Sequence, residues 1–123
     1  MPTITHFNIP TDDIERAKKF YTKLFNWKIE RLPGPMEYYE ITTTSEKDEG
    51  GVNGGMTKRE NPYDRITNYV DVQSIDEYLT RVEKLGGKIV LPKTTVPGFG
   101  YLAVCIDTEN NTFGLWETDE HPK

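Results

Sequence analysis

The chain has 123 residues, a formal net charge of −5, and 35% hydrophobic against 28% charged residues. This length favours one domain with a sizeable core, and the interspersed charges disfavour a nucleic-acid-binding surface. No apolar run reaches the roughly 20 residues that cross a bilayer, and the first residues do not resemble a signal peptide. A single cysteine excludes an internal disulfide. We therefore expect a cytoplasmic protein that does not bind a membrane.

The first half of the sequence predicts a strand, a helix and three further strands. Residues 3–9 alternate between apolar and polar, which is typical of a strand. Apolar residues then recur at helical spacing from Ile14 to Phe25, after a capping box formed by Asp12 and Glu15. The following segments are predicted as a strand at 27–32, a turn at 32–36, a strand at 37–44, a charged loop at 45–51 and a strand at 52–59.

The second half repeats this order after a linker at 60–65. A strand at 66–72 precedes a helix that begins with a Ser74/Glu77 capping box and ends at Gly86-Gly87. The remaining segments are predicted as a strand at 88–92, a turn loop at 94–100, a strand at 101–107, a turn at 108–111 and a strand at 112–118.

Short matching segments support an internal repeat. ITHF at 4–7 corresponds to ITNY at 66–69, and FNWKI at 25–29 corresponds to LGGKI at 85–89. The fold predicted for residues 1–123 is α+β and a single domain. It consists of two β-α-β-β-β modules, at about 3–60 and 66–118, that form a curled mixed sheet around a cleft.

The sequence resembles the vicinal oxygen chelate superfamily, which includes glyoxalase I, bleomycin-resistance proteins and extradiol dioxygenases. The resemblance rests on the paired modules and on three segments: IERAKKFYTKLFNW at 14–27, YLTRVEKLGGKIV at 78–90 and VPGFGYLAVCIDTENNTFGLWE at 96–117. It implies a fold that hosts isomerases, dioxygenases, thiol transferases and plain binders. It also implies a homodimer, because short members of the superfamily usually dimerise.

The resemblance implies four positions for metal ligands, and only His6 matches one of them. A transition-metal site needs three or four convergent donors. The sequence therefore disfavours a divalent metal, and no cofactor is predicted. The other three positions fall on Gly54 and Gly55 in the fourth strand, on Thr67 by strand phase or Asn68 by sequence match, and on Gly114.

The glycines at these positions are expected to leave room in an aromatic-lined cleft. Alternation places Trp116 on the face of Gly114. It places Tyr101 on the face opposite to that of Leu102, Val104 and Ile106. Glu40 and Asp71 could share the concave face, although neither matches a ligand position. The predicted ligand pocket comprises His6, Asn8, Gly54, Thr67, Tyr69, Tyr101, Gly114 and Trp116.

Several interpretations of these residues stay open. His6 is the candidate catalytic residue, in contact with a ligand or as an acid or base, but it could also bond only a backbone carbonyl. Tyr69 and Trp116 could simply fill the interior. The leading hypothesis is a metal-independent domain that binds a small molecule, or an enzyme acting in the cleft. The alternatives are a metal-dependent isomerase of the lactoylglutathione lyase type that uses His6, and an interaction protein with a vestigial cleft.

Overall fold

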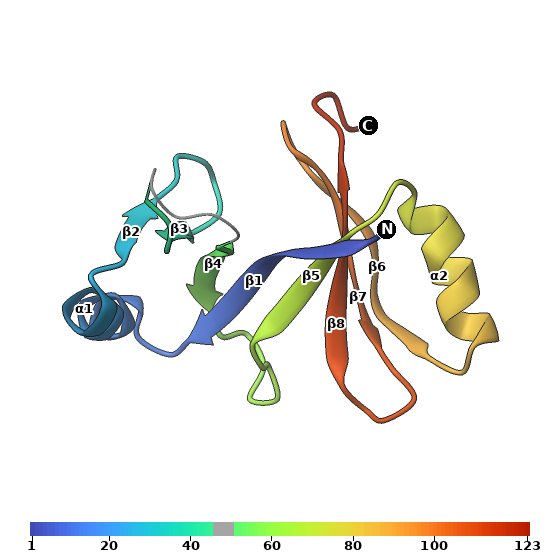
Figure 1. Cartoon of the computed structure of the whole chain (residues 1–123), viewed down its shortest axis with the longest axis horizontal. Helices are drawn as coiled ribbons and strands as arrows, with labels where there is room; N and C mark the ends of the chain where they lie inside the picture. Colours follow the sequence, from blue (N-terminus) through green and yellow to red (C-terminus); the bar gives the residue numbers. More distant parts are fainter. Residues whose placement is uncertain (46–50) are drawn as a thin grey trace. The chain divides into compact units, whose positions relative to one another are not determined.

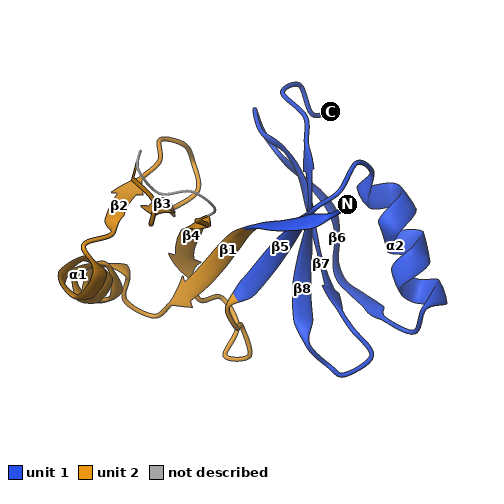
Figure 2. Ribbon diagram, in the orientation of Figure 1, with its two compact units in different colours: residues 1–5, 67–123 blue, residues 6–66 orange. Residues whose placement is uncertain are grey.

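A computed structural model describes residues 1–45 and 51–123 (Figure 1). The charged loop predicted at 45–51 therefore lies almost entirely outside the described residues. The chain divides into two compact units (Figure 2). Unit 2 comprises residues 6–66, and unit 1 comprises residues 67–123 together with residues 1–5.

Unit 2 contains one helix that packs on a small mixed sheet. Its elements are β1 (Thr3–Thr11, whose first three residues are grouped with unit 1), α1 (Ile14–Phe25), β2 (Lys28–Arg31), β3 (Tyr38–Thr42) and β4 (Asn53–Lys58). The strand order is β2-β3-β4-β1, in which β1 and β4 are parallel and the other neighbours are antiparallel. The core between helix and sheet is formed by Ile9, Ile14, Ile29, Tyr39, Ile41 and Met56.

Unit 1 repeats this architecture. Its elements are β5 (Thr67–Asp71), α2 (Ile75–Lys84), β6 (Lys88–Val96), β7 (Gly100–Ile106) and β8 (Thr112–Thr118). The strand order is β5-β8-β7-β6, and the parallel pair is β5 with β8. The core under α2 is formed by Val72, Ile75, Tyr101, Ala103, Cys105 and Leu115.

The predicted α+β class and the order β-α-β-β-β, repeated twice, are confirmed. Each unit has the single parallel strand pair that makes its sheet mixed. Among the described residues, no helix has both the length and the apolar character that crossing a membrane requires.

The helix ends follow their local sequence signals, with one correction. Ser74 caps α2 as predicted and accepts a hydrogen bond from the backbone of Glu77 at 3.3 Å. Asp13, and not Asp12, caps α1, and its carboxylate accepts from the Arg16 backbone at 3.0 Å. Two adjacent aspartates satisfy the same capping preference, so the sequence alone did not separate them. Asn26 ends α1 with a left-handed backbone.

Strand β6 is longer than predicted. It continues to Val96 and takes up residues 94–96 of the segment predicted as a turn loop at 94–100. Its pairing with β7 is irregular between Leu91 and Thr94, around Pro92. Proline cannot donate to a strand partner, but an edge strand such as β6 tolerates it at a bulge. The proline therefore interrupts the register without ending the strand.

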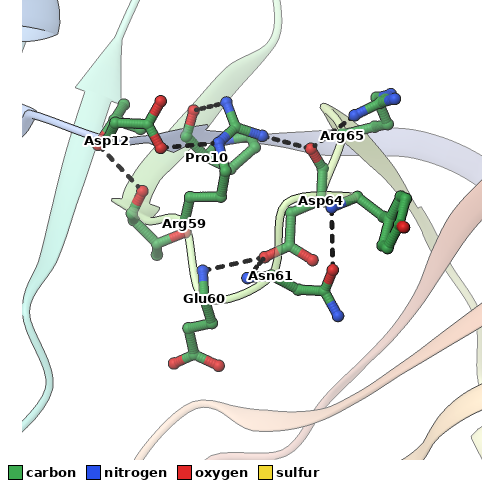
Figure 3. A network of polar contacts seen from close by, with 10 residues as sticks. Pro10, Asp12, Arg59, Glu60, Asn61, Asp64 and Arg65 are labelled. Carbon is green, nitrogen blue, oxygen red and sulfur yellow. Dashed lines mark hydrogen bonds and ion pairs between the residues drawn. The ribbon is translucent and has the colours of Figure 1, made fainter.

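Arg59 organises the segment that leads out of β4 (Figure 3). Its guanidinium donates to the Asp12 carboxylate at 3.1 Å and to the carbonyl oxygens of Asp64 and Pro10. The Asp64 carboxylate in turn accepts from the backbone N–H groups of Glu60 and Asn61, each at 3.1 Å. This network holds the predicted linker in a defined turn within unit 2.

Candidate functional site

Each unit has one sheet face under its helix and one on the other side, which we call the helix-distal face. In unit 2, Phe7 and Ile9 pack with the core under α1, so the alternating His6 and Asn8 lie on the helix-distal face. Asn8 there donates to the Thr57 hydroxyl at 3.0 Å. Strand pairing extends this face across the sheet. It carries His6 and Asn8 from β1, Gly55 and Thr57 from β4, and Tyr38 and Glu40 from β3.

His6 and Tyr38 form a hydrogen-bonded pair on this face. The distance between His6 Nε2 and Tyr38 Oη is 3.2 Å. Strand β4 runs between the strands that carry these residues, so the tyrosine reaches across it. The β4 residue beneath the tyrosine is Gly55, where a Cβ would collide with the Tyr38 hydroxyl and lie 2.6 Å from its ring carbon Cε2. The pair therefore depends on a glycine at position 55.

The electrostatic setting keeps His6 largely uncharged near neutral pH. Burial lowers the pKa of His6 below its ordinary value of 6.5, and the negative charge of Glu40 offsets part of that effect. A neutral imidazole can accept a hydrogen bond or a proton through one ring nitrogen. The His6–Tyr38 pair therefore offers exchangeable hydrogen-bonding groups to a small molecule.

Gly54 does not belong to this face, so the prediction that it opens room in the pocket is wrong. A Cβ on Gly54 would lie 2.5 Å from the Phe7 carbonyl oxygen and 2.6 Å from the Phe7 ring. Met56, two residues along β4 and therefore on the same face as Gly54, is fully buried in the core under α1. Gly54 is thus needed for close strand packing on the helix side, and Gly55 is the glycine that shares a face with His6.

The helix-distal face of unit 1 is more apolar. Val70 and Val72 pack with the core under α2, so Thr67, Tyr69 and Asp71 lie on the other side, as strand phase predicted for Thr67. Pairing joins them to two further strands in two rows. One row is Tyr69, Gly114 and Val104, and the next is Asp71, Trp116 and Leu102.

Tyr69 and Gly114 repeat the contact seen in unit 2. A Cβ on Gly114 would collide with the Tyr69 ring, with 2.8 Å to its Cγ atom. Burial raises the pKa of the Tyr69 hydroxyl above its ordinary value, so this hydroxyl keeps its proton near neutral pH. Trp116 is half-buried on the same face, and its indole N–H donates to the Thr118 hydroxyl at 3.0 Å. The expectation that Gly55 and Gly114 leave empty space is therefore wrong, because tyrosine rings lie against both.

Tyr101 is the second residue of the predicted pocket that lies elsewhere. It is buried with Ala103 and Cys105 in the core under α2, and Leu102 and Val104 occupy the helix-distal face. Its hydroxyl accepts a hydrogen bond from the Lys123 backbone at 2.8 Å, and the Lys93 ammonium lies 4.3 Å from its ring centre. Tyr101 is thus a core residue. Cys105 is fully buried, and burial raises the pKa of its thiol, which makes it a poor nucleophile.

Two comparisons with known proteins address the family. A model described as "Bleomycin resistance protein-like N-terminal" matches residues 3–44. CFP32, a predicted glyoxylase of Mycobacterium bovis, is 26% identical over 117 residues, covering 93% of this chain and 45% of that protein. The chain therefore spans about half the length of the mycobacterial relatives it matches.

A relative of similar length decides the family. A glyoxylase-like domain-containing protein of Didymella fabae is 30% identical over 122 residues, which cover 91% of each chain. The chain belongs to the vicinal oxygen chelate superfamily.

Solved structures agree with this assignment at the level of the fold. A glyoxalase/bleomycin resistance protein/dioxygenase superfamily member from Vibrio splendidus 12B01 has a TM-score of 0.65 at 14% identity, covering 97% of this chain and 100% of that chain. Methylmalonyl-CoA epimerase from Mycobacterium tuberculosis has a TM-score of 0.67 at 11% identity, covering 94% and 87%. Such low identities carry no information about activity.

The residues at the superfamily's metal positions do not fit a metal centre. Gly55 and Gly114 have no donor atoms, and tyrosine rings lie where longer side chains would extend. Thr67 supplies only a hydroxyl, which leaves His6 as the one strong donor of the set. Within residues 1–45 and 51–123, no three His, Cys, Asp or Glu side chains converge as metal ligands do.

The contact between Tyr69 and Gly114 can be tested by a double-mutant cycle. Gly114→Ala should lower the free energy of unfolding by about 1–3 kcal/mol, because the new methyl group displaces the half-buried ring of Tyr69. In a Tyr69→Ala background the same substitution should cost almost nothing. Urea unfolding of the four proteins measures the coupling. An equal cost in both backgrounds would show that the ring does not lie against Gly114.

Burial of His6 predicts a specific pH dependence of stability. Because its pKa is lower in the folded than in the unfolded state, the unfolded chain takes up the proton first as pH falls. The wild type should therefore lose stability relative to His6→Gln as pH falls from about 7.5 to about 5.5, and the two should run parallel above that range. Urea unfolding across the range measures this difference. A difference that is constant with pH would contradict a buried, neutral His6.

Proposed function

We propose that a unit of this chain binds a small, flat organic molecule on its own helix-distal face, without the metal centre of the chain's catalytic relatives. The observation that carries the proposal is the placement of Tyr38 against Gly55 and Tyr69 against Gly114. At two positions where the superfamily's enzymes hold metal ligands, this chain has a glycine, and a tyrosine ring from a neighbouring strand lies against each glycine.

The chemistry of the two faces supports binding of a molecule with both apolar and polar parts. Unit 1 offers the flat, half-buried ring of Trp116 with Leu102 paired directly opposite it. Unit 2 offers the His6–Tyr38 pair, which can donate and accept hydrogen bonds. Aromatic and apolar surface with a few placed polar groups is the usual composition of small-molecule sites.

A panel of ring compounds tests the proposal directly. It contains benzene, naphthalene and indole scaffolds, each carrying an aminoethyl, a hydroxyethyl or an acetate side chain. We expect at least one scaffold to bind in the presence of a strong chelator and to raise the melting temperature by mass action. Protein NMR would place the perturbed signals at Tyr38, Tyr69 or Trp116.

Variants connect the binding to the proposed residues. Trp116→Leu should weaken binding at the face of unit 1, and Tyr38→Leu should weaken binding at the face of unit 2. Each loss should be about tenfold or more, because each substitution removes an aromatic contact worth roughly 1–3 kcal/mol. Tyr63→Leu is the matched control, because this tyrosine is 81% exposed on the linker turn and belongs to neither face.

Two results would overturn the proposal. One is the absence of binding by every compound of the panel. The other is turnover of a methylglyoxal–thiol hemithioacetal that is lost with chelator and with His6→Ala. That second result would establish the isomerase hypothesis, to which the names of the mycobacterial relatives lend support.

A further inference from the structure

Both helix-distal faces place a carboxylate beside an aromatic ring. In unit 2, one cross-strand row consists of Glu30, Glu40, Gly55 and Asn8, taken from β2, β3, β4 and β1. Tyr38 crosses this row at Gly55 on its way to His6. Burial lowers the pKa of His6, and the negative charge of Glu40 on the same face raises it in part. The ring of Tyr38 and the charge of Glu40 therefore lie on one small patch.

Unit 1 shows the same combination independently. Asp71 pairs directly with Trp116 across the parallel strands β5 and β8. Leu102 completes that row on the other side of Trp116. The exposed Asp71 therefore lies beside Trp116, which carries the largest aromatic ring of this face.

Few of the positively charged residues in the described strands lie on the helix-distal faces. Within the described strands, alternation and pairing put only Lys28 and Lys88 on the helix-distal faces, and both lie on the outer strands β2 and β6. Lys28 already forms a 3.4 Å ion pair with Glu30, an exposed pair of the kind that contributes little to stability.

Glu40 also faces a like charge. It is paired directly opposite Glu30 across β2 and β3, an arrangement that costs free energy because like charges repel. A positive group near this pair would relieve the repulsion. Aromatic faces attract cations as well, so the ring and the acid favour the same kind of ligand group.

We propose that the ligand of either helix-distal face is a flat organic cation, in which an aromatic or conjugated ring carries a basic nitrogen. The inference rests on the proposed binding function and specifies its ligand class. In unit 2 the ring of the ligand packs on Tyr38 and its nitrogen lies next to the Glu40 carboxylate. In unit 1 the ring packs on Trp116 and the nitrogen lies next to the Asp71 carboxylate. Acyl-CoA and glutathione-type substrates are acidic and are disfavoured by the same carboxylates.

Three indole compounds of the panel differ mainly in charge and test this class. Tryptamine is a cation, tryptophol is neutral and indole-3-acetate is an anion near neutral pH. At low salt and with chelator, we expect tryptamine to bind about fivefold more tightly than tryptophol, as one nearby opposite charge predicts, and indole-3-acetate to bind most weakly. Calorimetry or NMR titration gives the three affinities.

Charge-neutral variants assign the preference to named residues. Glu40→Gln together with Asp71→Asn should bring the affinities for tryptamine and tryptophol together. Glu83→Gln is the matched control, because it removes a carboxylate from α2, away from the helix-distal faces, and should leave the preference unchanged.

The possible outcomes separate this inference from the proposed function. Binding in which the anion equals or exceeds the cation overturns the ligand class and leaves the binding function in place. A cation preference that survives in the Glu40→Gln, Asp71→Asn double variant overturns the role of these carboxylates. If no compound of the whole panel binds, the proposed function fails and the ligand class fails with it.

Discussion

The close approach of a tyrosine ring to a glycine backbone is the contact on which both helix-distal faces depend. Tyr38 crosses β4 at Gly55, and Tyr69 lies against Gly114 on the neighbouring strand β8. Neither ring could take this position if the glycine carried a Cβ. In unit 2 the same contact brings the Tyr38 hydroxyl within hydrogen-bonding distance of His6. Each glycine therefore acts as a support for an aromatic side chain.

This constraint changes the chemistry that a vicinal oxygen chelate fold can offer. A side chain with an oxygen or nitrogen donor at position 55 or 114 would have to displace a ring, so substitution by glutamate alone would not rebuild a metal site. What remains is aromatic surface, a neutral histidine and nearby carboxylates. Such groups recognise organic ligands through stacking, hydrogen bonds and charge. The fold is shared with enzymes, and the binding function proposed for this chain depends on these local replacements.

The sequence predicted the architecture well because the repeat, the helix caps and the strand alternation are local signals. It also placed Tyr69 correctly with Gly114, since both assignments rest on strand phase. It misplaced Tyr101, because β7 is an inner strand with apolar residues on both faces, and alternation then cannot tell which face is under the helix. It read Gly55 as open space, because the ring that fills that space comes from β3, and only the pairing register brings Tyr38 there. Contacts between strands distant in sequence were thus the main source of error.

The most direct test of this account is the nuclear Overhauser effect between tyrosine ring protons and glycine α-protons in the wild-type protein. The account predicts strong cross-peaks from Tyr69 to Gly114 and from Tyr38 to Gly55, because a Cβ built on either glycine would lie within 3 Å of the ring. Assigned signals without these cross-peaks would show that the rings do not lie on the glycines. The positions of the superfamily's metal ligands would then be open, and the argument for metal-independent binding would lose its structural basis.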